Sequence, residues 1–77
     1  MNTRLFKAEM IAYGDTQVTL SAAMGLSASR LNAKINERDG AAFTQREMTF
    51  LIERYSLTPQ KAIDIFFPGS YQKGNSE

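Results

Sequence analysis

Hydrophobic positions recur along this chain with the period of a helix rather than that of a strand. Apolar residues one turn apart predict three helices in the first half of the sequence, over about 3–13, 16–24 and 28–36. A fourth helix is predicted to open at Thr44, and a fifth covers about 58–67. The pattern therefore predicts an all-α domain of five short helices.

Turn and capping residues mark the ends of these helices. Gly14 and Gly25 stand where the first and second helices would end in the left-handed conformation that glycine favours. The clearest start is Thr44-Gln45-Arg46-Glu47, a capping box in which Thr44 and Glu47 each bond the other's backbone amide. Thr58 as N-cap and Pro59 at the first helical position predict the start of the fifth helix.

The rest of the chain reads as connections and a tail. Residues 37–42 are expected to form a loop, with Asp39-Gly40 as its turn. From 69 onward the sequence is polar and contains glycine and serine, which is typical of a frayed end. We therefore expect one domain over 1–68 and a flexible tail over 69–77.

The segment from Thr16 to Asn36 has the features of a helix-turn-helix that binds DNA. In that motif two helices cross steeply around a short turn, so that the second enters a major groove. The geometry needs small residues at the crossing, a glycine at the turn, an apolar plug, a capping hydroxyl and two apolar anchors one turn apart. The sequence supplies them in this order: Ser21, Ala22 and Ala23, then Gly25, Leu26 and Ser27, then Leu31 and Ile35. The alternative is an ordinary pair of packed helices.

Several short stretches carry a resemblance to a known family. Gln17-x-x-Leu20 followed by Gly25-Leu26-Ser27 resembles the repressor/Cro-type helix-turn-helix family of phage and bacterial regulators. Lys34-Ile35-Asn36, the stretch 43–47 and Ile65-Phe66-Phe67 resemble a subgroup of short phage proteins, the Cro-like repressors and modulators of repression. The resemblance implies a compact five-helix repressor-like domain over about 3–67, with the motif in helices two and three. Glu37 departs from it, because the family usually has glycine there.

A helical wheel divides the third helix into an inner face and a face for DNA. With Leu31 and Ile35 turned inward, the positions expected to meet base edges are Ala28, Ser29, Asn32, Ala33 and Asn36. Asparagine can pair bidentately with adenine, and alanine can contact the methyl group of thymine. Phosphate contacts are expected from a basic edge and from two helix starts, at Arg30, Lys34, Arg38, Gln17, Gln45 and Arg46. The alternative is a solvated basic face, with Arg38 bound to Glu37 or Asp39.

Charge and composition limit the other classes of function. The net charge is only +1, but no acidic residue lies between Asp15 and Glu37. Cysteine and histidine are absent, which excludes disulfides, thiolate or imidazole metal sites and nucleophiles that need a histidine base. We therefore expect neither an enzyme nor a bound cofactor or metal. No run of 18 apolar residues and no apolar signal core occur, so the expectation is a cytoplasmic protein without a membrane role.

Together these features favour a phage or prophage transcription regulator. It would bind double-stranded DNA as a homodimer on paired half-sites, one helical turn apart. The alternative is a modulator that keeps the fold and acts by binding a partner repressor protein, which the low net charge and the small groove-facing side chains would suit. The adjacent Phe66 and Phe67 cannot both point inward from a short helix, so one of them is a candidate dimer contact.

Overall fold

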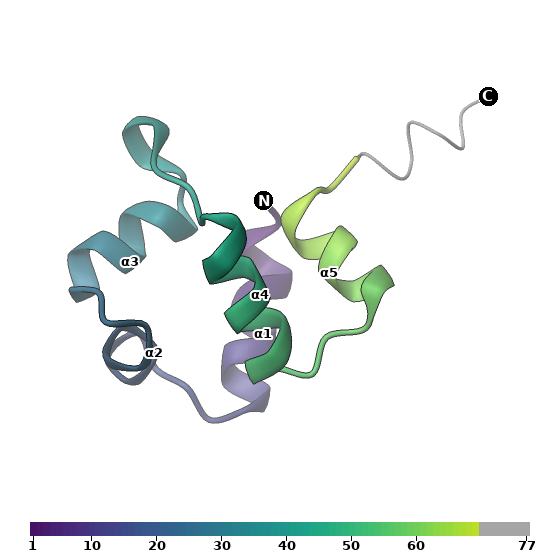
Figure 1. The fold of residues 1–77 in the computed structure, drawn as a ribbon, viewed down its shortest axis with the longest axis horizontal. Coiled ribbons are helices and arrows are strands. Elements are labelled where there is room, and N and C mark those ends of the chain that lie inside the picture. The colour runs from purple at the N-terminus through teal and green to yellow at the C-terminus, as the bar shows by residue number, and fades with distance from the viewer. Residues whose placement is uncertain (70–77) are drawn as a thin grey trace.

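The computed structural model describes residues 1–69, and these fold into helices without strands (Figure 1). The α-helices are α1 (Thr3–Ala12), α2 (Gln17–Met24), α3 (Ala28–Ile35), α4 (Gln45–Arg54) and α5 (Pro59–Phe66), and a short 3-10 turn, η1 (Arg38–Gly40), lies between α3 and α4. The predicted all-α class is confirmed, and the helices lie close to the bounds expected for them. The tail expected over 69–77 lies outside the described residues, apart from Gly69.

Figure 1 shows α2 and α3 at one end of the domain and α5 at the other, with α1 and α4 between them. One core joins all five helices, because each contributes a completely buried residue: Phe6, Leu20, Leu31, Leu51 and Ile65. Burying a side chain of this size contributes about 1.5–3 kcal/mol. The helices are therefore stabilised by a shared centre, which none of them could supply alone.

Aromatic rings fill the centre of this core. The Phe6 ring lies 5.7 Å from that of Phe43, 6.2 Å from that of Tyr55 and 6.5 Å from that of Phe66, measured between centroids. Phe66 is buried whereas Phe67 is 52% exposed, so only one of these neighbours points inward, as expected.

The ends of the helices largely follow the capping residues in the sequence. Gly14 and Gly25 adopt positive φ angles of 73° and 70°. Ser27 then caps α3 by accepting a hydrogen bond from the Arg30 amide (3.1 Å), so only residues 25–27 separate α2 from α3. The capping box of α4 is also confirmed: Thr44 Oγ1 accepts from the Glu47 amide at 3.1 Å, and Glu47 Oε1 accepts from the Thr44 amide at 2.9 Å.

The loop after α3 differs from the expectation of a single turn. Glu37 and Asp39 both have positive φ, 51° and 53°, and Gly40 follows at 81°. The chain reverses at Glu37, forms η1 and reverses again before it reaches α4. Two side-chain-bearing residues in the left-handed region cost about 1–2 kcal/mol each, and glutamate itself does not favour that conformation.

Replacing Gly25 by alanine should destabilise the domain for a purely conformational reason. A Cβ built at this position meets no atom within 4 Å, so the substitution causes no clash. The left-handed φ alone is expected to lower the free energy of unfolding by about 1–2 kcal/mol, as measured by urea denaturation. Gly25→Asn should cost less than Gly25→Ala, because asparagine tolerates this conformation. Equal losses for the two variants would contradict the explanation.

Candidate nucleic-acid interface

The first turn of α3 is open to solvent, while its opposite face is anchored in the core. Leu31 and Ile35 are buried, as the helical wheel requires, and Ala28, Ser29 and Arg30 are exposed. No carboxylate lies within 4 Å of the Arg30 guanidinium among residues 1–69. This turn therefore presents small side chains and one arginine whose charge is not matched within the described chain.

The second half of α3 is more engaged than the wheel suggests. Asn32 and Ala33 are half-buried, and Asn36 is exposed. The Asn32 Oδ1 accepts hydrogen bonds from the Asn36 side-chain amide (3.2 Å) and from the Arg38 guanidinium. A bidentate pair with adenine needs this oxygen as an acceptor, and both of its lone pairs are already used, so Asn32 would have to release at least one donor to form it.

The expected basic edge of α3 separates into two kinds of residue. The Lys34 ammonium donates to Glu47 Oε1 at 3.0 Å and to the Ala42 carbonyl at 3.3 Å, and the side chain is only 12% exposed. Arg38 bonds Asn32 and has no carboxylate within 4 Å in residues 1–69, so the alternative ion pair with Glu37 or Asp39 is not formed. The charge of Lys34 is thus matched within the fold, whereas the charges of Arg30 and Arg38 have no carboxylate partner in residues 1–69.

Glu47 is held ionised by the groups around it. Burial acts to raise its pKa, but the Thr44 amide and the Lys34 ammonium outweigh that effect and lower the pKa below its ordinary value. The carboxylate therefore stays negative and matches the charge of Lys34. Lys34 therefore neutralises Glu47 between α3 and α4, and its ammonium is not free to reach a phosphate.

The starts of α2 and α4 hold the remaining predicted phosphate contacts. Gln45 and Arg46 are exposed in the first turn of α4, and Arg46 has no carboxylate within 4 Å in the described chain. Gln17 is half-buried at the first position of α2, where it lines a hollow with Met10, Ile11 and other residues of α1. The geometry therefore presents Arg46 to a ligand more openly than it presents Gln17.

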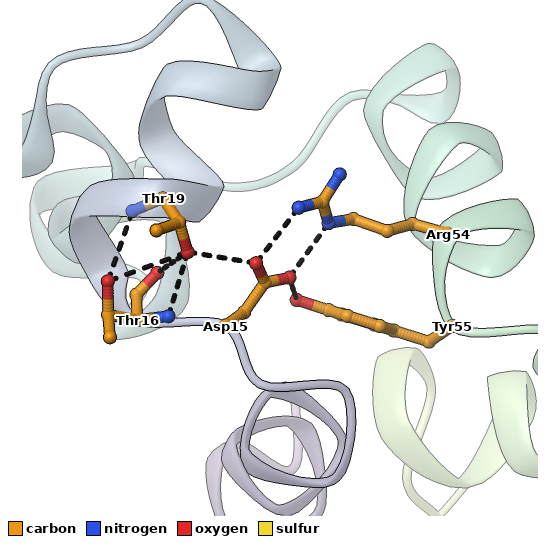
Figure 2. Close-up of polar contacts among 5 residues, drawn as sticks. All are labelled: Asp15, Thr16, Thr19, Arg54 and Tyr55. Carbon is orange, nitrogen blue, oxygen red and sulfur yellow. Dashed lines mark hydrogen bonds and ion pairs between the residues drawn. The ribbon is translucent and has the colours of Figure 1, made fainter.

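Asp15, which the sequence analysis did not select, joins the start of α2 to the end of α4 (Figure 2). Arg54 donates to both of its carboxylate oxygens, from Nε at 2.7 Å and from Nη2 at 2.9 Å. The Tyr55 hydroxyl donates at 2.6 Å, and the Thr19 hydroxyl donates from α2 at 2.9 Å. The Asp15 side chain is 6% exposed, so this buried carboxylate has its acceptors filled from two helices.

The charges in this cluster are fixed at neutral pH. Hydrogen bonds from Arg54, followed by those from Tyr55 and Thr19, hold the pKa of Asp15 well below its ordinary value in spite of burial. Burial and the hydrogen bond to Asp15 raise the pKa of Tyr55. Arg54 and Tyr55 lie 39 and 40 residues away along the chain, so no local spacing in the sequence marks their contact with Asp15.

Acidic side chains do not gather into a metal site in the described chain. Nowhere in residues 1–69 do three or more cysteine, histidine, aspartate or glutamate residues come close enough to hold an ion. Asp15 and Glu47 are each paired with a cation instead. None of the helices described is long and apolar enough to cross a membrane.

Asp15→Asn should be strongly destabilising because it leaves Arg54 beside an uncharged partner. We expect the free energy of unfolding at neutral pH to fall by about 2–4 kcal/mol in urea titrations. The folded-state pKa of Asp15 is lowered, so its contribution is complete above the unfolded-state value of about 4 and is lost as the pH falls below it. The gap between wild type and variant should therefore narrow from about pH 5 toward about pH 2.

Asp64→Asn is the matched control for this experiment. Within residues 1–69, Asp64 accepts only from Gln60 on the same helix, through a solvent-exposed hydrogen bond of 2.9 Å. Its loss should change the stability by less than about 0.5 kcal/mol. A comparable loss in the two variants, or a gap that does not depend on pH, would contradict the role assigned to Asp15.

Comparisons with family models, with curated proteins and with solved structures return no match. The resemblance to repressor/Cro-type regulators consequently rests on the short motifs within the chain itself. What the chain offers a ligand is the open first turn of α3, with Arg30 on α3 and Arg46 at the start of α4.

Proposed function

We propose that this chain is a sequence-specific DNA-binding transcription regulator of the repressor/Cro type. It inserts α3 into the major groove and binds as a homodimer on two half-sites. The observation that carries the proposal is the exposed first turn of α3, where small side chains adjoin an arginine with no acidic partner among residues 1–69. No acidic residue occurs from Thr16 to Asn36, the whole span of the helix pair.

The helix pair has the parts that insertion into a groove requires. A turn of three residues joins α2 to α3, and Leu31 and Ile35 hold α3 to the core by one face. Ala28 and Ser29 are short, so the backbone of α3 can approach base edges closely. The major groove is about 12 Å wide and admits one α-helix.

Ion pairs within the fold match several acidic charges near this surface. Glu37 is bound by the Met1 ammonium at 2.9 Å, whereas Asp39 has no cation within 4 Å among residues 1–69. Glu47 is matched by Lys34 and Asp15 by Arg54, so neither carboxylate opposes a phosphate strand. Arg30 and Arg46 then supply phosphate contacts, assisted by Gln45 and the amide end of α4. Because few long side chains face the groove, the shape of the DNA contributes to its selection.

The proposal is tested with a fluorescein-labelled duplex of mixed sequence, titrated by anisotropy at several salt concentrations. Wild type should bind at low salt, and Arg30→Ala and Arg46→Ala should each weaken binding several-fold and reduce the slope of log K against log salt by about one. These losses should be similar for all duplexes, because a phosphate contact reads no sequence.

Lys61→Ala provides the control for lost charge. Lys61 lies on α5, at the end of the domain away from α3, where its ammonium lies 3.2 Å from Glu9 (Figure 1). This variant should bind DNA as wild type does. No binding of any duplex by wild type at low salt would refute the proposed function.

A second candidate is a modulator that binds a partner repressor protein. Ile11 and Val18 are 77% and 69% exposed, and Ile11 borders the hollow between α1 and α2. Large apolar side chains exposed to water can mark a surface to which another protein binds. Co-purification with a repressor that Ile11→Glu abolishes, together with weak binding of DNA, would favour this function over the first.

A further inference from the structure

The end of α3 carries a polar cluster of three residues, Asn32, Asn36 and Arg38. The Asn36 side-chain amide donates to the Asn32 Oδ1 at 3.2 Å and to the Asn32 carbonyl at 3.1 Å. The Arg38 Nη2 donates to the same Oδ1 from the loop. One amide oxygen thereby fixes an arginine beside the outer face of the helix.

The backbone of the loop brings Arg38 to this position. The left-handed conformation of Glu37 turns the chain back just after α3, so the Arg38 side chain reaches a residue six positions earlier. Asp39 and Gly40, also left-handed, then lead the chain toward α4. The Arg38 guanidinium is hydrogen-bonded to α3, and the remaining residues of η1 continue toward α4.

A held guanidinium suits the recognition of a base edge. Arginine forms bidentate pairs with phosphate as well as with guanine O6 and N7, but the pair with guanine also requires the guanidinium to lie in the plane of the base. Arginine has five N–H donors, and Asn32 accepts from one nitrogen, so an edge of the fork stays available. The Asn32 oxygen, by contrast, is already used twice.

We infer that Arg38 reads guanine in the major groove, oriented by Asn32 and Asn36 as positioning residues. The inference rests on the proposed function, since it needs α3 in the groove. It gives Arg38 a base-reading role in place of the phosphate contact expected from the sequence. It also gives Asn32 a role in holding Arg38 rather than in pairing with adenine.

The test begins with a selection from duplexes that contain 20 random base pairs, using the full wild-type chain. Wild type should enrich a motif with guanine at a defined position in each half-site. Arg38→Ala and Arg38→Lys should both lose enrichment at that position alone, because lysine keeps the charge but lacks the planar fork. Affinity for the selected site should fall roughly tenfold to hundredfold for each variant.

A chemical change in the DNA tests the same contact without altering the protein. Replacing the selected guanine by 7-deazaguanine removes the N7 acceptor, so wild type should bind less tightly while Arg38→Ala should not change. Asn32→Ala should weaken the preference for guanine, and Asn32→Asp, which keeps an acceptor oxygen for Arg38, should retain the preference even if its affinity falls. Circular dichroism is used to check that each variant is folded.

The possible results separate this inference from the proposed function. A uniform loss of affinity in Arg38→Ala, with an unchanged motif, would assign Arg38 to a phosphate and overturn the inference alone. A preference retained by Arg38→Lys, or wild-type binding that is indifferent to 7-deazaguanine, would also overturn it. If wild type binds no duplex at low salt, both proposals fail together.

Discussion

The buried carboxylate of Asp15 is the interaction on which the arrangement of this small domain depends. A single negative charge, almost removed from water, accepts from Arg54, Tyr55 and Thr19. A partly desolvated charge is tolerated only when its partners are in place. The need to keep Asp15 paired therefore holds the start of α2 against the end of α4, in addition to the packing of the apolar core.

A second ion pair acts at the other end of α4. Lys34, from the last turn of α3, meets Glu47 at the first turn of α4. With α2 joined to one end of α4 and α3 to the other, the helix pair is attached to the rest of the domain by charge as well as by Leu20 and Leu31. Rigid attachment supports the proposed DNA-binding function, because contacts to bases lose their value when misplaced.

Much of the fold follows from local signals in the sequence, and the site follows only in part. The helix ends are predictable because glycines and capping hydroxyls act on neighbouring residues, as Gly25, Ser27 and Thr44 do. The wheel places Leu31 and Ile35 correctly for the same reason. It treats Lys34 and Asn32 as free side chains, because it contains no information on Glu47 or Arg38. The role of Asp15 is not predictable for a related reason, since Arg54 and Tyr55 are distant along the chain and adjacent to it only after folding.

The two roles of Glu47 constrain which substitutions this sequence can accept. Its Oε1 atom accepts both the Thr44 amide and the Lys34 ammonium, so one oxygen serves a helix start and a contact between helices. A substitution at 47 would remove the side-chain half of the α4 capping box and leave the Lys34 ammonium without its carboxylate in the same step. Substitutions at 34 and 47 are therefore expected to be accepted together or not at all. Among relatives of this chain, these two positions should vary as a pair even where the exposed first turn of α3 has diverged.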